Sequence, residues 1–203
     1  MKKIVLFGIL VGCIFTSAAQ NKGQVEFGVN LGVNTSTVST NSVRADTGTG
    51  VNFGLSADYY FSTRWSIKTK LILDQKGWNN GFFEDEFNSY TTNYNLNYLT
   101  VPVMANYHFG RTKNWYLHFG PYVGFLLTAD ESSRGVDVTE AFNTTDVGLS
   151  AGVGVKIPVS NKVKLSLEYE GQSGFLDIFK GMDGPSVTNS RGAFNIGLHF
   201  LMK

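Results

Sequence analysis

The chain has 203 residues and a formal net charge of +1, and its 16% of charged residues lies well below the about 25% of an ordinary soluble domain. Hydrophobic residues make up 42% and aromatic residues 14% of the sequence, which excludes a disordered chain. The single Cys excludes a disulfide-stapled scaffold, and the balanced charge without a basic cluster argues against a nucleic-acid binder.

Residues 1–19 have the pattern of a secretory signal peptide. Two lysines precede the apolar run Ile4–Phe15, and small residues follow it. We expect cleavage after Ala19, which leaves residues 20–203 as one exported domain. The tetrapeptide that ends at Cys13 also fits a lipobox, so a lipidated Cys13 is the alternative.

Beyond the signal peptide, apolar residues recur at every second position in eight stretches. From Val25 to Asn34, for example, each apolar residue is followed by Glu, Gly or Asn. Such alternation predicts strands with one apolar and one polar face. Each stretch is close to the about 9–11 residues with which a tilted strand crosses a bilayer. The eight predicted strands begin near Val25, Val51, Trp65, Leu99, Trp115, Val147, Val163 and Phe194.

The links between these predicted strands alternate between short and long. Short turns at one end and long loops at the other are the layout of an outer-membrane barrel. We therefore predict an all-β fold, a single eight-stranded antiparallel up-and-down transmembrane β-barrel with both termini in the periplasm. The short links lie at 62–64, 110–114 and 160–162, and the long links at 35–50, 77–94, 128–146 and 173–191.

The polar face distinguishes a membrane barrel from a soluble one. It consists mostly of Gly, Asn, Ser and Thr, whereas a face in contact with water would carry many more charges. Aromatic residues of the apolar face gather beside the short turns, which predicts a periplasmic girdle. This girdle comprises Tyr59, Phe61, Trp65, Tyr107, Phe109, Trp115 and Phe200. A second girdle near the long loops is predicted from Trp78, Phe82, Phe83, Phe87, Tyr90 and Tyr94.

Charged residues on the polar face are expected to point into the barrel. The interior of an eight-stranded barrel is just wide enough for side chains, so we interpret these residues as a plug of mixed-sign pairs. A narrow polar pore is the alternative. Lys68 and Lys70 have the sign to pair with Glu168 and Glu170, but the two pairs lie on opposite walls. The set is Glu26, Asp58, Lys68, Lys70, Asp74, Lys76, Lys156, Lys164, Glu168 and Glu170.

Two prolines interrupt neighbouring predicted strands. Proline removes a hydrogen bond from the ladder, and Pro102 is expected to lie opposite Tyr122, beside Pro121. We predict a paired bulge or kink at this point that helps the barrel to close.

The hairpin formed by Tyr98–Gly110 and Tyr116–Leu127 resembles the central hairpin of the outer-membrane β-barrel family labelled porin family or PorT family. Asp146–Gly154 and Leu165–Tyr169 are similar to later strands of that family. The resemblance implies an outer-membrane barrel over the whole exported chain, and it brings no catalytic signature. The C-terminal Asn195–Met202 resembles the signal that the barrel-assembly machinery reads.

No cofactor motif and no catalytic constellation is found in the sequence. There is neither a Gly-x-Ser-x-Gly nor a His-Glu-x-x-His segment. By strand direction, His108, His118 and His199 fall on the inward face in the periplasmic half, away from the outer leaflet where a lipid-modifying enzyme would work. We predict interior packing histidines and no enzyme.

The long loops are acidic, and Glu84, Asp85 and Glu86 form the candidate cluster for a divalent cation that bridges to lipid headgroups. We expect a structural or surface-interaction protein whose long loops are the working surface. Expected partners are outer-membrane lipid, the barrel-assembly machinery and a protein or surface met by the loops, with no nucleic acid. A narrow porin-like channel, a lipid-modifying enzyme and a secretion-apparatus partner are the alternatives.

Overall fold

The computed structural model describes residues 22–39, 45–84, 89–181 and 186–202. The predicted signal peptide and the alternative of a lipidated Cys13 therefore lie outside the described residues. Within the described part of the chain, no helix is long and apolar enough to span a membrane.

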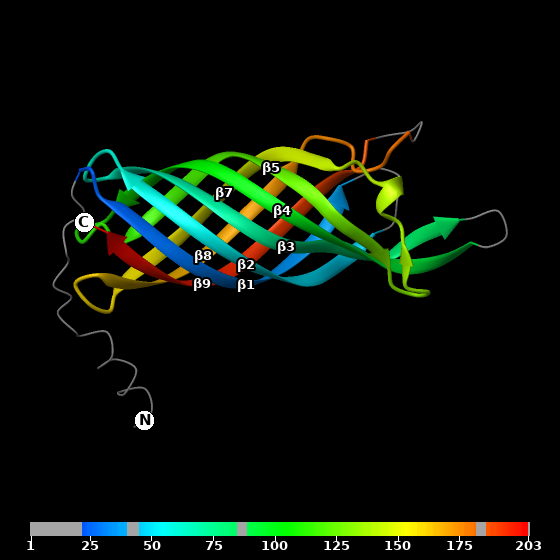
Figure 1. Cartoon of the computed structure of the whole chain (residues 1–203), viewed down its shortest axis with the longest axis horizontal. Coiled ribbons are helices and arrows are strands. Elements are labelled where there is room, and N and C mark those ends of the chain that lie inside the picture. Colours follow the sequence, from blue (N-terminus) through cyan, green and yellow to red (C-terminus); the bar gives the residue numbers. More distant parts are fainter. Residues whose placement is uncertain (1–21, 40–44, 85–88, 182–185, 203) are drawn as a thin grey trace, which may run out of the picture.

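Eight antiparallel strands form a closed ring, which confirms the predicted fold (Figure 1). The order around the ring is β4-β3-β2-β1-β9-β8-β7-β5, and pairing between β4 and β5 closes it. The strands are β1 (Val25–Ser39), β2 (Asp46–Tyr60), β3 (Trp65–Glu84), β4 (Ser89–Phe109), β5 (Trp115–Glu131), β7 (Thr145–Pro158), β8 (Val163–Gly174) and β9 (Thr188–Met202). The short strand β6 (Val136–Asp137) and the 3₁₀ turn η1 (Thr139–Ala141) lie in the link between β5 and β7.

The strands are longer than the alternation of apolar residues predicts. They contain 12 to 21 residues, and most of the predicted long links 35–50 and 77–94 is strand. On the outward face, the apolar Leu73 of β3 is followed by the polar Gln75, and the apolar Leu99 of β4 is preceded by the polar Asn97. The hydrogen-bonded ladder between the two strands nevertheless continues to Glu84. The apolar pattern therefore ends before the sheet does, and in Figure 1 the β3–β4 hairpin projects beyond the rest of the barrel.

The apolar face points outward, as predicted. Val29 is 41% exposed on the outer wall, whereas the adjacent Asn30 is 7% exposed inside the ring. Leu55 and Val153 are likewise exposed, and a Cβ placed on Gly152 would touch the inward-facing imidazole of His118. Apolar residues on the outside and polar residues inside are the reverse of a soluble domain.

The aromatic girdle at the short-turn end is confirmed, but the second girdle is wrong in part. Trp65 pairs with Tyr107 on the outer wall, with ring centroids 4.8 Å apart. Trp78 and Tyr94, in contrast, are buried and stack on each other inside the ring. Both residues are even-numbered, like the inward-facing Lys76. The period of two continues along both strands, so both side chains point inward. The side chains of Phe82, Phe83 and Phe87 lie outside the described residues.

The two prolines do not form the predicted bulge. Pro102 pairs with Tyr122 as expected, but the register of β4 and β5 is the same on both sides of the prolines. The register shift lies further along, between Asn97 and Tyr98. A missing N–H removes a hydrogen bond without adding a residue, so the register is kept.

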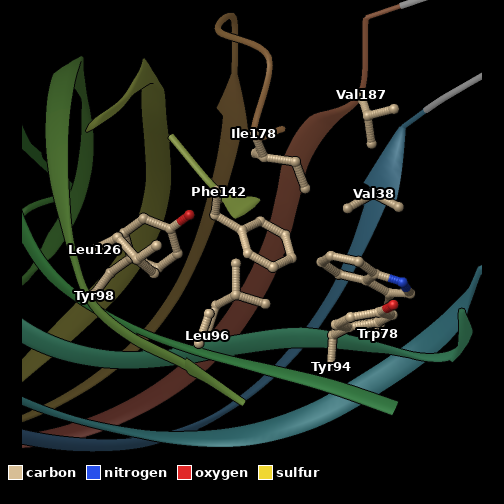
Figure 2. Close-up of a cluster of buried hydrophobic side chains, with 10 residues drawn as sticks. Val38, Trp78, Tyr94, Leu96, Tyr98, Leu126, Phe142, Ile178 and Val187 are labelled. Atoms are coloured by element: carbon tan, nitrogen blue, oxygen red, sulfur yellow. The ribbon is translucent and has the colours of Figure 1, made fainter. Parts of the chain in front are cut away.

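A cluster of buried apolar side chains fills the ring at its long-loop end (Figure 2). Four strands, β1, β3, β4 and β5, and the links β5–β7 and β8–β9 contribute to it. We call it the mouth cluster, and it comprises Val38, Trp78, Tyr94, Leu96, Tyr98, Leu126, Ala129, Phe142, Ile178 and Val187.

Candidate functional site

The candidate functional site is the charged interior of the ring. Of the side chains that the structure describes, six acidic and six basic ones are buried there, so the interior as a whole is balanced. The acids are Glu26, Asp58, Asp74, Asp146, Glu168 and Glu170, and the bases are Lys68, Lys70, Lys76, Lys156, Lys164 and Arg191. Ten of the twelve were predicted from the alternation.

Asp146 and Arg191 were missed because the predicted strands began after Asp146 and after Arg191. Asp146 lies two residues before the inward position Gly148 on β7, and Arg191 lies four residues before the inward position Asn195 on β9. An even spacing places both residues on the inward face. Extending the period of two past the last apolar residue would have found them.

The tier nearest the short turns, which we call the lower tier, contains two acids and two lysines. Lys156 Nζ lies 2.8 Å from a carboxylate oxygen of Asp58 and also contacts Glu26. Lys164 Nζ lies 2.7 Å from the other oxygen of Glu26. The Tyr60 hydroxyl accepts a further hydrogen bond from Lys156, so this tier is neutral and densely bonded.

The middle tier contains three acids and three bases. Lys68 Nζ lies 2.7 Å from Glu168, and Lys70 Nζ contacts Glu168 and lies 2.5 Å from Glu170. Arg191 joins Glu170, at 3.2 Å, to Asp74 on β3, at 2.9 Å. The lysines of β3 and the glutamates of β8 do start on opposite walls, as predicted, but their side chains are long enough to meet.

The upper tier is one ion pair below the mouth cluster. Lys76 Nζ lies 3.1 Å from Asp146, whose carboxylate also accepts hydrogen bonds from Tyr122 and Asn189. The ammonium lies 5.0 Å from the ring centroids of both Tyr98 and Tyr122. Two aromatic faces and a carboxylate thus hold this cation at the boundary between the charged and apolar layers.

Each tier is electrically neutral by itself. Burying a charge without a partner is very costly, whereas a paired charge with further hydrogen bonds is tolerated. Neutral tiers therefore explain how twelve acidic and basic side chains are accommodated inside the ring. For the same reason, none of the three tiers presents a ring of like charges to which a cation or an anion could bind.

The three histidines face the interior, where the alternation places them. His108 lies 3.3 Å from the Ser66 hydroxyl and His199 lies 2.9 Å from the Ser166 hydroxyl. His118 sits between Glu168 and Glu170, at 3.6 and 3.7 Å.

Within the described part of the chain, two groups of side chains have oxygen and nitrogen atoms close enough together to be considered as metal ligands. They are Glu26 with Asp58 and His199, and His118 with Glu168 and Glu170. In both groups lysine ammoniums already contact the carboxylates. A metal ion would therefore have to displace these lysines and leave their charges buried without partners, so the groups fit an ion-pair network better than a metal site.

The mouth cluster closes the ring above the charged tiers. Trp78 and Tyr94 stack with centroids 4.8 Å apart, and Phe142 meets both rings edge-on at about 6 Å. Phe142 also packs on Phe179 at 4.9 Å, and the two residues form an isolated β-bridge. Figure 2 shows the side chains of the wall and of the links pointing toward one another. The links are thereby held against the wall.

A carboxylate organises the turn that follows β5. Glu131 accepts hydrogen bonds from the Thr92 hydroxyl and from the backbone N–H groups of Ser133 and Arg134, the last at 3.0 Å. Burial acts to raise the pKa of this carboxyl, but these hydrogen bonds outweigh it and hold the pKa below its usual 4.5. In β6, hydrogen bonds from Thr139 lower the pKa of Asp137 in the same way.

The predicted divalent-cation cluster is not brought together by any described geometry. Glu84 ends β3, but its side chain lies outside the described residues, as do Asp85 and Glu86. The cluster stays a hypothesis from the sequence.

An apolar outer wall around an interior of ion pairs is stable only when lipid surrounds the ring, so the fold defines a transmembrane β-barrel. Residues 18–180 match the family model described as outer membrane protein beta-barrel domain, and the chain belongs to this family. The protein is therefore located in the outer membrane. The description is broader than the porin or PorT label, which stays a resemblance.

Solved structures show the same fold at low sequence identity. OprG from Pseudomonas aeruginosa is similar with a TM-score of 0.58 and 10% identity, over 91% of this chain and 98% of that chain. Neisserial surface protein A is similar with a TM-score of 0.52 and 17% identity, over 86% of this chain and 96% of that chain. None of the curated proteins matches the sequence.

Proposed function

We propose that this protein is a non-conducting scaffold of the outer membrane whose extracellular part binds a partner at the cell surface. The observation that carries the proposal is the mouth cluster. In barrels of this type the short turns are periplasmic and the long loops extracellular. An apolar core at the extracellular end holds two long links in one arrangement, and a preformed surface binds with less loss of conformational entropy.

The surface offered to a partner includes the turn Ser132–Asp137, whose residues are all exposed. Acidic residues outnumber basic ones among the described residues of this end. The acids at least partly exposed are Asp46, Asp130, Asp137, Glu140 and Asp177, and the bases are Arg134 and Lys180. Charge complementarity favours a partner with a basic surface.

Two layers support the absence of conductance. The three neutral tiers fill the part of the ring within the membrane, and the mouth cluster covers them from outside. Their stability depends on close pairing, which an open water-filled pore would remove. His108, His118 and His199 have interior side chains and not lipid as neighbours, which favours a packing role over a catalytic one.

Two measurements test this proposal together. Planar bilayers with the refolded protein should show no discrete single-channel steps, and such steps would establish the channel in its place. A photoreactive amino acid at Val136, which is exposed in the extracellular part, should give a discrete crosslinked product on intact cells. The same amino acid at Asn161, in a short periplasmic turn, is the control and should not give that product. Equal products from both positions would contradict a surface role.

A further inference from the structure

The outward wall carries an elongated trench with a volume of about 790 Å³. Its lower side is a row of outward side chains that pair directly across five neighbouring strands. The row consists of Leu167, Ile196, Leu31, Phe53 and Leu73. Because these side chains stand next to one another around the barrel, the trench runs across the strands and not along them.

The upper side of the trench is the next row of outward side chains. It consists of Phe194, Val33, Val51, Gln75, Asn97 and Leu127. Gly32, Asn52 and Asp74 lie between the two rows. Gly32 has no side chain, and the side chains of Asn52 and Asp74 point into the barrel, so the backbone of these residues forms the floor of the trench. Apolar walls over a backbone floor make a slot of the shape of a hydrocarbon chain.

The pairing of β2 and β3 is irregular at the upper side of the trench. Their pairing has a register shift between Thr47 and Asn52. Gly50 lies in this stretch, and a Cβ there would collide with the backbone oxygen of Gln75. The absence of a side chain at this position lets the backbones of β2 and β3 approach each other beside the trench.

The trench climbs across the membrane and is polar only at its upper end. Leu167 is four residues from the short-turn end of its strand, Val33 is eight, and Asn97 is twelve. The side chains of Gln75 and Asn97 are the outward amides of the trench, and all others that form its walls are apolar. The polar end is therefore extracellular, and the apolar end lies toward the middle of the bilayer.

We propose that this trench is a binding site for one acyl chain of an outer-leaflet lipid. The ester or amide carbonyl of the lipid lies at Gln75 and Asn97, and the chain descends past Val33 toward Leu167. The trench is continuous with the lipid-facing wall, so the ligand reaches it without leaving the membrane. Strands of such barrels tilt by about 35–45°, so a chain that crosses them is inclined at about 45–55° to the bilayer normal.

Photo-crosslinking in vesicles tests the position and direction of the chain. The probe is phosphatidylethanolamine with a diazirine either at the end of one acyl chain or beside its carbonyl, mixed into vesicles that contain the refolded protein. The terminal diazirine should label the peptides around Leu167 and Ile196, and the carbonyl-proximal one those around Gln75 and Asn97. Equal labelling of residues 149–157 on β7, outside the trench, would show ordinary lipid contact and overturn the site.

A matched pair of substitutions tests occupancy. Val33 and Val29 are both exposed valines of β1, but only Val33 lines the trench. In native mass spectrometry the wild type should retain one phosphatidylethanolamine, Val33→Trp should lose retention by about tenfold, and Val29→Trp should keep it. Heat-modifiable mobility on gels confirms that each variant is folded. A wild type without lipid, equal retention by both variants, or a dimer in place of the lipid adduct overturns the proposal. Should Val33→Trp not fold, the crosslinking pattern of the wild type decides.

Discussion

Lys70 and Glu170 begin on opposite sides of the barrel, and their charged atoms meet 2.5 Å apart in the middle tier. Lys70 also contacts Glu168, so one ammonium serves two carboxylates. The pairing explains why an interior with so many charges is stable. It also identifies Lys70 as the side chain whose removal should destabilise the barrel most.

Lys70→Met should destabilise the folded barrel by about 3–5 kcal/mol, because the buried middle tier then has three acids against two bases and one uncompensated negative charge. Urea unfolding in lipid vesicles, followed by heat-modifiable mobility, measures the change. The double variant Lys70→Met with Glu170→Gln removes one charge of each sign and should be less destabilised than the single variant. A single variant as stable as the wild type would show that the middle tier is not a tightly paired network.

Trp78→Ala should loosen the extracellular links without opening the barrel. The substitution removes the largest ring of the mouth cluster, and a buried Trp→Ala change costs about 3–5 kcal/mol. Protease added to intact cells should cut the segments 132–144 and 175–181 faster than in the wild type, whereas conductance stays absent because the charged tiers lie below. Trp115→Ala, on the outer wall, is the control and should leave the cleavage rate unchanged.

The turn Ser132–Arg134 should be stable at neutral pH and loosen in acid. The folded state lowers the pKa of Glu131 below 4.5, so the carboxylate contributes stability that is present above pH 4.5 and lost as the pH falls through the lowered pKa. Hydrogen exchange at the amides of Ser133 and Arg134, corrected for the intrinsic rate, measures this. In Glu131→Gln the dependence on acid should vanish, and its persistence would point to another group.

Ser36→Ala should weaken the upper wall. The Ser36 hydroxyl donates to the backbone oxygen of Gly77 and accepts from its N–H, both at 2.8 Å, where the pairing of β2 and β3 is irregular. Removing it leaves two buried backbone groups unpaired, each worth about 1–3 kcal/mol. Unfolding in urea measures the loss, with the exposed Ser39→Ala on the same strand as the control. Equal stability of the two variants would contradict this account.

The period of two was sufficient to predict the fold, because each strand shows one face to lipid and one to the interior. The ends of the strands could not be predicted in this way. Beyond Leu73 and Leu99 the outer wall leaves the membrane, so outward residues become polar although the hydrogen-bonded ladder continues. The alternation of inward and outward positions still continues there, and following it would have placed Trp78 in the mouth cluster.

The ion pairs inside the barrel were harder to predict from the sequence. Alternation shows that Lys68 and Glu168 both point inward, but it contains no information on their relative height or on how far a side chain reaches across. The shear of the closed ring sets both, and it depends on the register of all eight strands together. The trench was missed for the same reason, since its two rows join residues from seven strands.

The tiers also constrain how the barrel folds. Lys68 and Glu168 are 100 positions apart in the chain, and Lys156 and Glu26 are 130 apart. Until the first and last strands join, these groups have no neighbour and must stay hydrated. Insertion should therefore be a late, all-or-none event in which water leaves the interior only as the seam between β1 and β9 forms. A chain halted before that step would hold uncompensated ions next to hydrocarbon, which gives the cell a physical basis for recognising and degrading it.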